Sequence, residues 1–154
     1  MVTLFRLNKP MQIKDPDLYM RSLYYLNVML FMTDNAPDLK KYLDRMKQYI
    51  SRHGSNLNPN SQHISFVYYQ LSRFNYCFLT KDFTTAYQLI AEVKQALPIH
   101  EPLMDNHRLM LFYYKFAIAA FQCNQWDEAL GHLHPILYKG RKHYKKVWIS
   151  MRDY

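Results

Sequence analysis

The histidines are the residues whose type and spacing most invite metal or acid–base chemistry in this chain. His132 and His134 lie two positions apart in a stretch with helical periodicity, so they point to different faces and cannot bind one ion together. His100 and His107 lie seven apart with two carboxylates nearby, and these are residue types that bind zinc. A proline-marked connection separates that pair, however. We therefore expect a solvated loop end there and predict no metal site.

Motifs for other chemistry are absent from the sequence. There is no HExxH, no Walker-type glycine loop and no Gly-x-Ser-x-Gly, and 3 glycines leave few places where backbone amides could cradle a phosphate. Cys77 and Cys123 are 46 residues apart and form no Cys-x-x-Cys pair, so we expect two small buried residues in a reducing compartment. We predict a non-enzymatic protein without a cofactor.

Positive charge is concentrated at the C-terminal end of the chain. Residues 139–154 contribute +5 of the formal net charge of +8, because six lysines and arginines stand against one aspartate. Two aromatic residues, Tyr144 and Trp148, are interleaved with these bases, a pattern that can neutralise phosphates and stack on exposed bases. The bases that would bind RNA or another polyanion are Lys139, Arg141, Lys142, Lys145 and Lys146.

The same C-terminal segment has a second interpretation, which we favour. Tyr144, Val147, Trp148 and Met151 recur at helical spacing and would form the inward face of a terminal helix. The bases would then be its solvated face, which is the usual place for a run of charges. Polyanion binding is therefore kept as the alternative function.

Composition predicts the elements that must position these residues. The 154 residues suit one domain or a few repeat units with a shared core, and 49% apolar and 16% aromatic residues supply that core. Few glycines and long segments without turn residues favour an all-α fold. No stretch is apolar enough to span a membrane and the first residues do not resemble a secretory signal, so we expect a cytoplasmic protein.

Apolar periodicity and helix-boundary signals predict six helices and a terminal one. Asp15-Pro16 and Asn35-Ala-Pro37 are typical helix starts, Gly54 is a stop, and residues 55–61 look like a linker. We expect Pro98 to stop the fourth helix, and Pro135 to kink or end the sixth near His134. The predicted helices are the apolar run 18–32 after Asp15-Pro16, a second from Asn35-Ala-Pro37 to near Gly54, then 64–79, 82–97, 103–123, one from 126 and a terminal one after Gly140.

A repeat organises these helices. Phe31 and Phe78 each begin a Phe-x-Thr motif, 47 residues apart, and a fainter third copy begins at Phe121, 43 residues further on. Self-similarity at a fixed spacing of a few tens of residues is typical of stacked helical repeats, in which each unit buries its apolar face against its neighbours.

These units resemble the tetratricopeptide repeat (TPR). The residues that carry the resemblance are a small residue in the second helix, an aromatic residue three positions earlier and a later proline. In the second unit they are Ala86, Phe83 and Pro98; in the third, Trp126 and Ala129 match, with Ala117 in the first helix. The first unit departs at Leu39 and Asn27 and the second at Phe74, and the spacings exceed the family's period of about 34 residues.

The resemblance implies a right-handed α-α superhelix of about three helical hairpins plus a terminal helix. Residues 1–154 would form one domain, with units 16–54, 62–98 and 102–139 and a terminal helix 141–152, which could be a piece of a longer repeat protein.

In that family the first helices of the units line a concave surface that binds a peptide or a partner's helix. Carried over, the partner-binding residues are Arg21, Tyr24, Val28, Tyr68, Leu71, Asn75, Leu111, Tyr114, Ile118 and Gln122. This surface is aromatic and apolar, which suits a protein-interaction scaffold for a hydrophobic segment. The alternative is that neighbouring helices or further chain cover these side chains.

Overall fold

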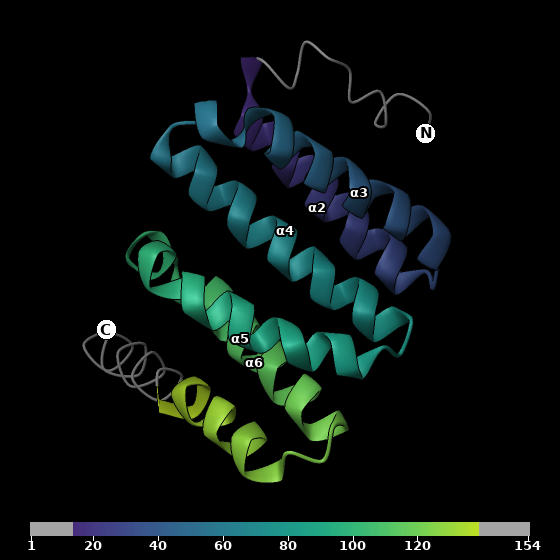
Figure 1. Ribbon diagram of the computed structural model, residues 1–154, viewed down its shortest axis with the longest axis vertical. Helices are drawn as coiled ribbons and strands as arrows, with labels where there is room; N and C mark the ends of the chain where they lie inside the picture. The colour runs from purple at the N-terminus through teal and green to yellow at the C-terminus, as the bar shows by residue number, and fades with distance from the viewer. Residues whose placement is uncertain (1–13, 139–154) are drawn as a thin grey trace, which may run out of the picture. The chain divides into compact units, whose positions relative to one another are not determined.

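The computed structural model describes residues 14–138 and is helical along nearly all of them, which confirms the all-α prediction (Figure 1). No strand occurs within that range. No helix among the described residues is long and apolar enough to cross a membrane. The α-helices are α2 (Pro16–Met32), α3 (Ala36–His53), α4 (Pro59–Leu79), α5 (Phe83–His100), α6 (Asn106–Gln122) and a further one, here called the 126–138 helix.

Short polar side chains fix the starts of these helices. Asp15, Asn35, Asn58 and Asp105 each accept a hydrogen bond from the amide three residues on, at 2.9, 3.2, 2.9 and 2.8 Å, and so satisfy a donor that has no partner within the helix. Proline follows the cap in the first turn of α2, α3 and α4, where its missing N–H costs nothing. The predicted starts of the first two helices are confirmed.

Three predicted boundaries are wrong. α4 begins at Pro59, inside the expected linker, because Asn58 caps it in the same way that Asp15 caps α2. α5 continues through Pro98 to His100, since a proline this close to a helix end removes one donor and leaves the preceding turns intact. The 126–138 helix likewise runs past Pro135, which rules out the early end near His134 that was predicted as the alternative to a kink.

The connection before α6 also differs from the prediction. Residues Glu101–Leu103 form a short 3-10 turn, and α6 starts only at Asn106, directly after its cap Asp105. An aspartate that offers its carboxylate to the first free amides sets the helix start more strongly than the apolar residue at 103.

One turn geometry recurs at the three repeat positions. Asp34, Lys81 and Asn124 have positive φ of 58°, 57° and 60°, and each follows the end of a helix. The next residue donates its amide proton to the carbonyl five positions earlier, with N–O distances of 2.9, 2.8 and 2.9 Å. This is the Schellman pattern of helix ends. The spacings of these turns, 47 and 43 residues, match the repeat spacings found in the sequence.

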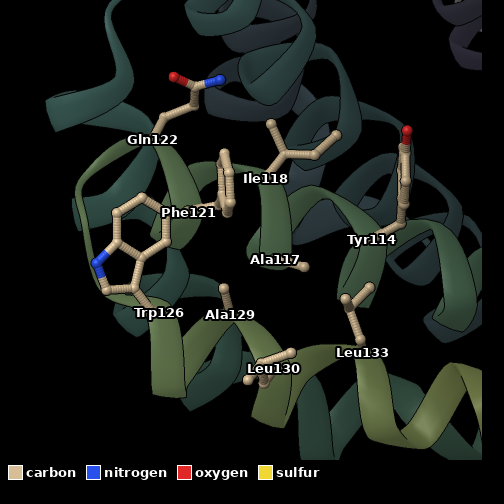
Figure 2. Close-up of a pocket in the computed structure, with 9 residues that line it drawn as sticks. All are labelled: Tyr114, Ala117, Ile118, Phe121, Gln122, Trp126, Ala129, Leu130 and Leu133. Carbon is tan, nitrogen blue, oxygen red and sulfur yellow. The ribbon is translucent and has the colours of Figure 1, made fainter.

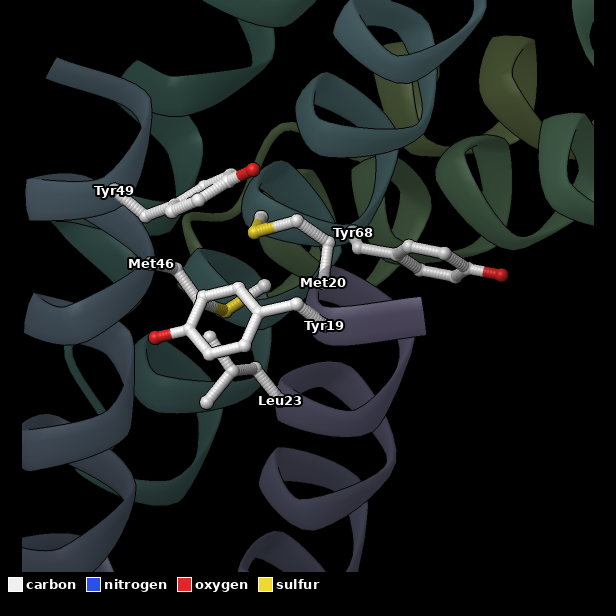
Figure 3. Packing of buried hydrophobic residues seen from close by; sticks show 6 residues of the cluster. All are labelled: Tyr19, Met20, Leu23, Met46, Tyr49 and Tyr68. Carbon is white, nitrogen blue, oxygen red and sulfur yellow. The ribbon is translucent and has the colours of Figure 1, made fainter. Parts of the chain in front are cut away.

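The chain divides into two compact units, one through Asp82 and one from Phe83. In unit 1, α2, α3 and α4 each contact the other two. Figure 3 shows the centre of this unit, where Met20 and Leu23 of α2 lie against Met46 and Tyr49 of α3. The rings of Tyr19 and Tyr49 are 4.9 Å apart. Tyr68 of α4 is buried in the same cluster, so all three helices contribute to one packed core.

In unit 2, α5 packs on α6, and the 126–138 helix is attached to both. Phe112 and Phe116 of α6 are fully buried, as are Ala86 and Val93 of α5. The thiol of Cys123, at the end of α6, donates to the carbonyl oxygen of Phe83 at 3.4 Å. The small residues let the helix backbones approach closely, while the phenylalanines fill the space between them.

Candidate partner-binding groove

An open apolar groove lies along unit 2 between α6 and the 126–138 helix (Figure 2). Its volume is about 440 Å³. Phe121 and Trp126 stand at one end and Tyr114 and Leu133 at the other, while the floor between them is built from alanine (Figure 2). The lining residues are Tyr114, Ala117, Ile118, Phe121, Gln122, Trp126, Ala129, Leu130 and Leu133.

The groove is made of large side chains exposed around two small buried ones. Tyr114, Phe121, Trp126 and Leu130 are 54%, 54%, 52% and 66% exposed. Ala117 and Ala129, in contrast, are 5% exposed. The Phe121 and Trp126 rings meet edge to face, with centroids 4.8 Å apart and planes at 80°. Such exposed, rigid aromatic area is typical of surfaces that bind a hydrophobic partner.

The partner-binding residues predicted for the third unit fall mostly in this groove. Tyr114, Ile118 and Gln122 line it, and Leu111 is half-buried outside it. The predicted site left out six lining residues. Four of them, Trp126, Ala129, Leu130 and Leu133, lie in the second helix of the hairpin, from which no position was carried over, whereas Ala117 and Phe121 lie in α6 itself. Trp126, Leu130 and Leu133 recur at spacings of four and three, a second apolar stripe beside the core-facing one, and that pattern could have revealed them.

The residues predicted for the first unit have mixed exposure. Arg21 is exposed, while Tyr24 and Val28 are half-buried. The ring of Tyr24 stacks on that of Tyr68, with centroids 4.7 Å apart and planes at 26°. Part of the predicted surface of α2 is therefore in contact with α4.

The residues predicted for the second unit, Tyr68, Leu71 and Asn75, are all buried. Asn75 donates its side-chain amide to Asn27 Oδ1 at 2.9 Å, and Asn27 is fully buried as well. The alternative stated above, cover by neighbouring helices, applies to these positions in unit 1. The predicted partner-binding residues of α4 in unit 1 are therefore buried, whereas those of unit 2 are exposed or half-buried.

A polar network ties the 126–138 helix to α5. Tyr87 donates to Glu128 Oε2 at 2.6 Å, and Glu128 Oε1 lies 3.3 Å from His132 Nε2. The Tyr87 hydrogen bond, followed by that of His132, lowers the pKa of Glu128. Burial lowers the pKa of His132, which packs against the edge of the Phe116 ring. No sequence signal placed Tyr87 beside Glu128, since they lie on different helices.

Cys77 and Lys115 also have shifted pKa values. Burial, with a smaller effect of Asp82, raises the pKa of the Cys77 thiol to about 11, so this cysteine is protonated and unreactive at neutral pH. Burial lowers the pKa of Lys115 to about 8. Neither group lines the groove.

Two further predictions concern a metal ion and the basic C-terminal residues. Within residues 14–138, no group of three or more His, Cys, Asp and Glu side chains is arranged to hold a metal ion. The predicted polyanion-binding residues Lys139, Arg141, Lys142, Lys145 and Lys146 lie outside the described residues.

Comparisons of the chain with models of protein families, with characterised proteins and with solved structures give no match.

Proposed function

We propose that this chain is a non-enzymatic, TPR-like interaction module whose unit 2 groove binds an amphipathic helix of a partner protein. The observation that carries the proposal is the groove itself, an apolar channel of about 440 Å³ with four large side chains more than half exposed. Large exposed apolar patches on a folded protein usually mark interaction sites. An open groove between two helices accepts an amphipathic helix through anchors at spacings of three and four.

Packing in unit 1 supports a helix as the ligand. There the α2–α3 pair, joined by the same turn type, receives α4 against both of its helices. The contact combines aromatic stacking with a buried amide hydrogen bond. A partner helix in the groove of unit 2 would find aromatic area at both ends and alanine between them, so it could approach the backbone closely (Figure 2).

Site-specific photo-crosslinking tests this function. A photoreactive amino acid at Leu130, inside the groove, is compared with the same amino acid at Leu103, which is 56% exposed and does not line the groove. In cell extract, position 130 should crosslink to an amphipathic helix of another protein and position 103 should not. The adduct should disappear when Ile118→Asp places a charge in the groove.

Two results would contradict the proposed function. Equal crosslinking from positions 130 and 103 would mean that the groove has no special role. Crosslinks to nuclease-sensitive material alone would transfer the function to the basic C-terminal segment. Far-UV circular dichroism of each variant checks that helicity is retained.

A further inference from the structure

The repeat spacing aligns residues of the unit 2 groove with residues of α2 that α4 covers in unit 1. The positive-φ turn residues Asp34 and Asn124 are 90 residues apart. The same offset carries Tyr24 to Tyr114 and Asn27 to Ala117. Tyr24 and Asn27 are the α2 residues that stack on and hydrogen-bond to α4, whereas Tyr114 and Ala117 line the groove. The groove is therefore the position at which a hairpin of this chain receives its next helix.

The chain that follows the 126–138 helix has the pattern that this position requires. In the sequence, Gly140 is a candidate helix stop, and Gly54 follows the end of α3 in the same way. Next come four apolar residues at spacings of three, one and three, Tyr144, Val147, Trp148 and Met151. In a helix these four would share one side and the bases would lie on the other.

Charge favours contact between this segment and the 126–138 helix and does not by itself select the groove. That helix carries Asp127 and Glu128 and no lysine or arginine, α6 on the other side of the groove carries Arg108 and Lys115 and no carboxylate, and residues 139–154 carry a formal charge of +5. Opposite charges on adjoining segments favour their encounter without determining the packed geometry. The apolar stripe would supply the contact area, and the bases would remain in water.

We infer that residues 144–151 of this chain occupy the unit 2 groove as an intramolecular ligand, and that a partner helix binds by displacing them. The inference rests on the proposed function, because it identifies what regulates the same groove. A ligand linked to its site by a few residues has an effective concentration in the millimolar range, about 1 mM or above. The segment therefore lowers the apparent affinity for partners in proportion to the fraction of time that it is docked.

Tryptophan fluorescence of the full chain tests the docking, because the only tryptophans are Trp126 in the groove and Trp148 in the segment. Trp126→Phe leaves Trp148 as the single reporter. Its emission should be blue-shifted, and its quenching by acrylamide several-fold weaker, than in the same chain unfolded in urea. In that background Leu130→Asp should shift the emission to the red and restore quenching, whereas the matched surface change Leu103→Asp should do neither.

Several outcomes would overturn the inference. If Trp148 is as quenchable in the folded chain as in urea, the segment is not docked, and this holds even if Leu130→Asp fails to fold. The same conclusion follows if Leu130→Asp and Leu103→Asp behave alike while circular dichroism shows intact helices. Loss of the blue shift on dilution would assign the groove to a second copy of the chain.

The crosslinks from position 130 separate this inference from the proposed function. Adducts within the same chain, to residues 144–151, support the docked segment, and adducts to another protein support partner binding. Trp148→Ala should increase the yield of partner adducts several-fold and decrease the yield of intramolecular adducts. Intramolecular adducts with no partner in any variant would leave the inference standing and remove the proposed function. Partner adducts unaffected by Trp148→Ala would do the reverse.

Discussion

The α2–α3 hairpin of unit 1 and the hairpin of α6 with the 126–138 helix in unit 2 share a turn and differ in what covers them. In unit 1, α4 packs over one side of the hairpin, and Tyr24 is half-buried against Tyr68. In unit 2 the corresponding Tyr114 is 54% exposed at the end of an open groove (Figure 2). The two hairpins therefore present the same kind of surface, and cover by a further helix decides whether that surface is core or an open groove.

The difference extends to the chemistry of equivalent positions. Asn27, fully buried between α2 and α4, accepts a hydrogen bond from Asn75, whereas the corresponding residue in unit 2 is Ala117. A buried amide needs a partner of fixed position, which suits a permanent contact between two helices. Alanine has no polar side-chain atom that needs a partner, so any apolar side chain can pack against it. The closed hairpin thus specifies one neighbour, and the open hairpin does not.

Truncation of the core should have the largest effect on unit 1. Met46→Ala removes a fully buried side chain from the α2–α3–α4 cluster (Figure 3) and should cost about 2–5 kcal/mol of unfolding free energy. Ile136→Ala, at the equivalent position of unit 2, alters a half-buried side chain and should cost less, about 1 kcal/mol. Urea denaturation measures both. Equal losses of unfolding free energy would contradict the proposed difference between a covered and an open hairpin.

Removal of the buried amide pair should have the next largest effect. Asn27→Ala leaves Asn75 without this acceptor and should destabilise unit 1 by about 1–2 kcal/mol, since a buried polar group that loses its partner pays its desolvation cost. Asn27 Nδ2 itself has no hydrogen-bond partner among the described residues, which limits the loss. Amide hydrogen exchange should show faster opening in α2 and α4.

A double-mutant cycle controls the experiment on the amide pair. Asn27→Ala combined with Asn75→Ala should cost less than the sum of the single changes, because the two side chains share one hydrogen bond. Strict additivity would mean that the bond does not hold α2 and α4 together. The reciprocal change Ala117→Asn should leave unit 1 unaffected.

Local signals explain which parts of the fold could be predicted. Caps such as Asp15 and Asn35 and the repeated turns act within a few residues, so the sequence alone located the first two helices and the repeat spacing. Asn58-Pro59 carried the same signal but was hidden in a polar stretch that looked like a linker. Pro98 was given too much weight, because proline disrupts a helix interior and has a smaller effect near its end.

Tertiary contacts explain why only part of the candidate site could be predicted. Periodicity marked Tyr68 and Tyr114 equally as apolar first-helix positions, yet one is buried and the other exposed. That distinction depends on which helix packs over each position, and apolar periodicity does not record it. The network from Tyr87 to His132 has the same origin, because residues on different helices meet only through the fold.

The half-buried Lys115 sharpens the comparison through the pH dependence of stability, with an effect on the order of 1 kcal/mol. Burial lowers the pKa of Lys115 from 10.5 to about 8, while Tyr25, at the equivalent position of unit 1, is 60% exposed. Between these two pKa values the unfolded chain binds more protons, so this group's contribution to stability rises with pH from about 8 to 10.5. Lys115→Met should raise the stability of unit 2 at pH 7 on the order of 1 kcal/mol.

Urea denaturation at pH 7, 9 and 10 measures the Lys115 effect as the difference between Lys115→Met and the unchanged chain. The advantage of the methionine variant should shrink as the pH increases, because neutral lysine no longer carries the cost of a buried charge. A constant difference across this range would show that the ammonium group is solvated in the folded chain.

The smallest effect is expected for the acid response of the network that holds the 126–138 helix to α5. The lowered pKa of His132 favours its neutral form, so its contribution to stability falls as the pH decreases below 6.5; the lowered pKa of Glu128 adds a loss below 4.5. His132→Gln should remove the first loss and Tyr87→Phe should reduce the second, since the Tyr87 hydrogen bond contributes most to the Glu128 shift. Hydrogen exchange in residues 126–138 at pH 7, 5.5 and 4 separates the two steps. Unit 1 has Tyr42 at the position of His132, so α3 should show neither step, and an acid response shared by α3 would assign the effect to the whole chain instead of this network.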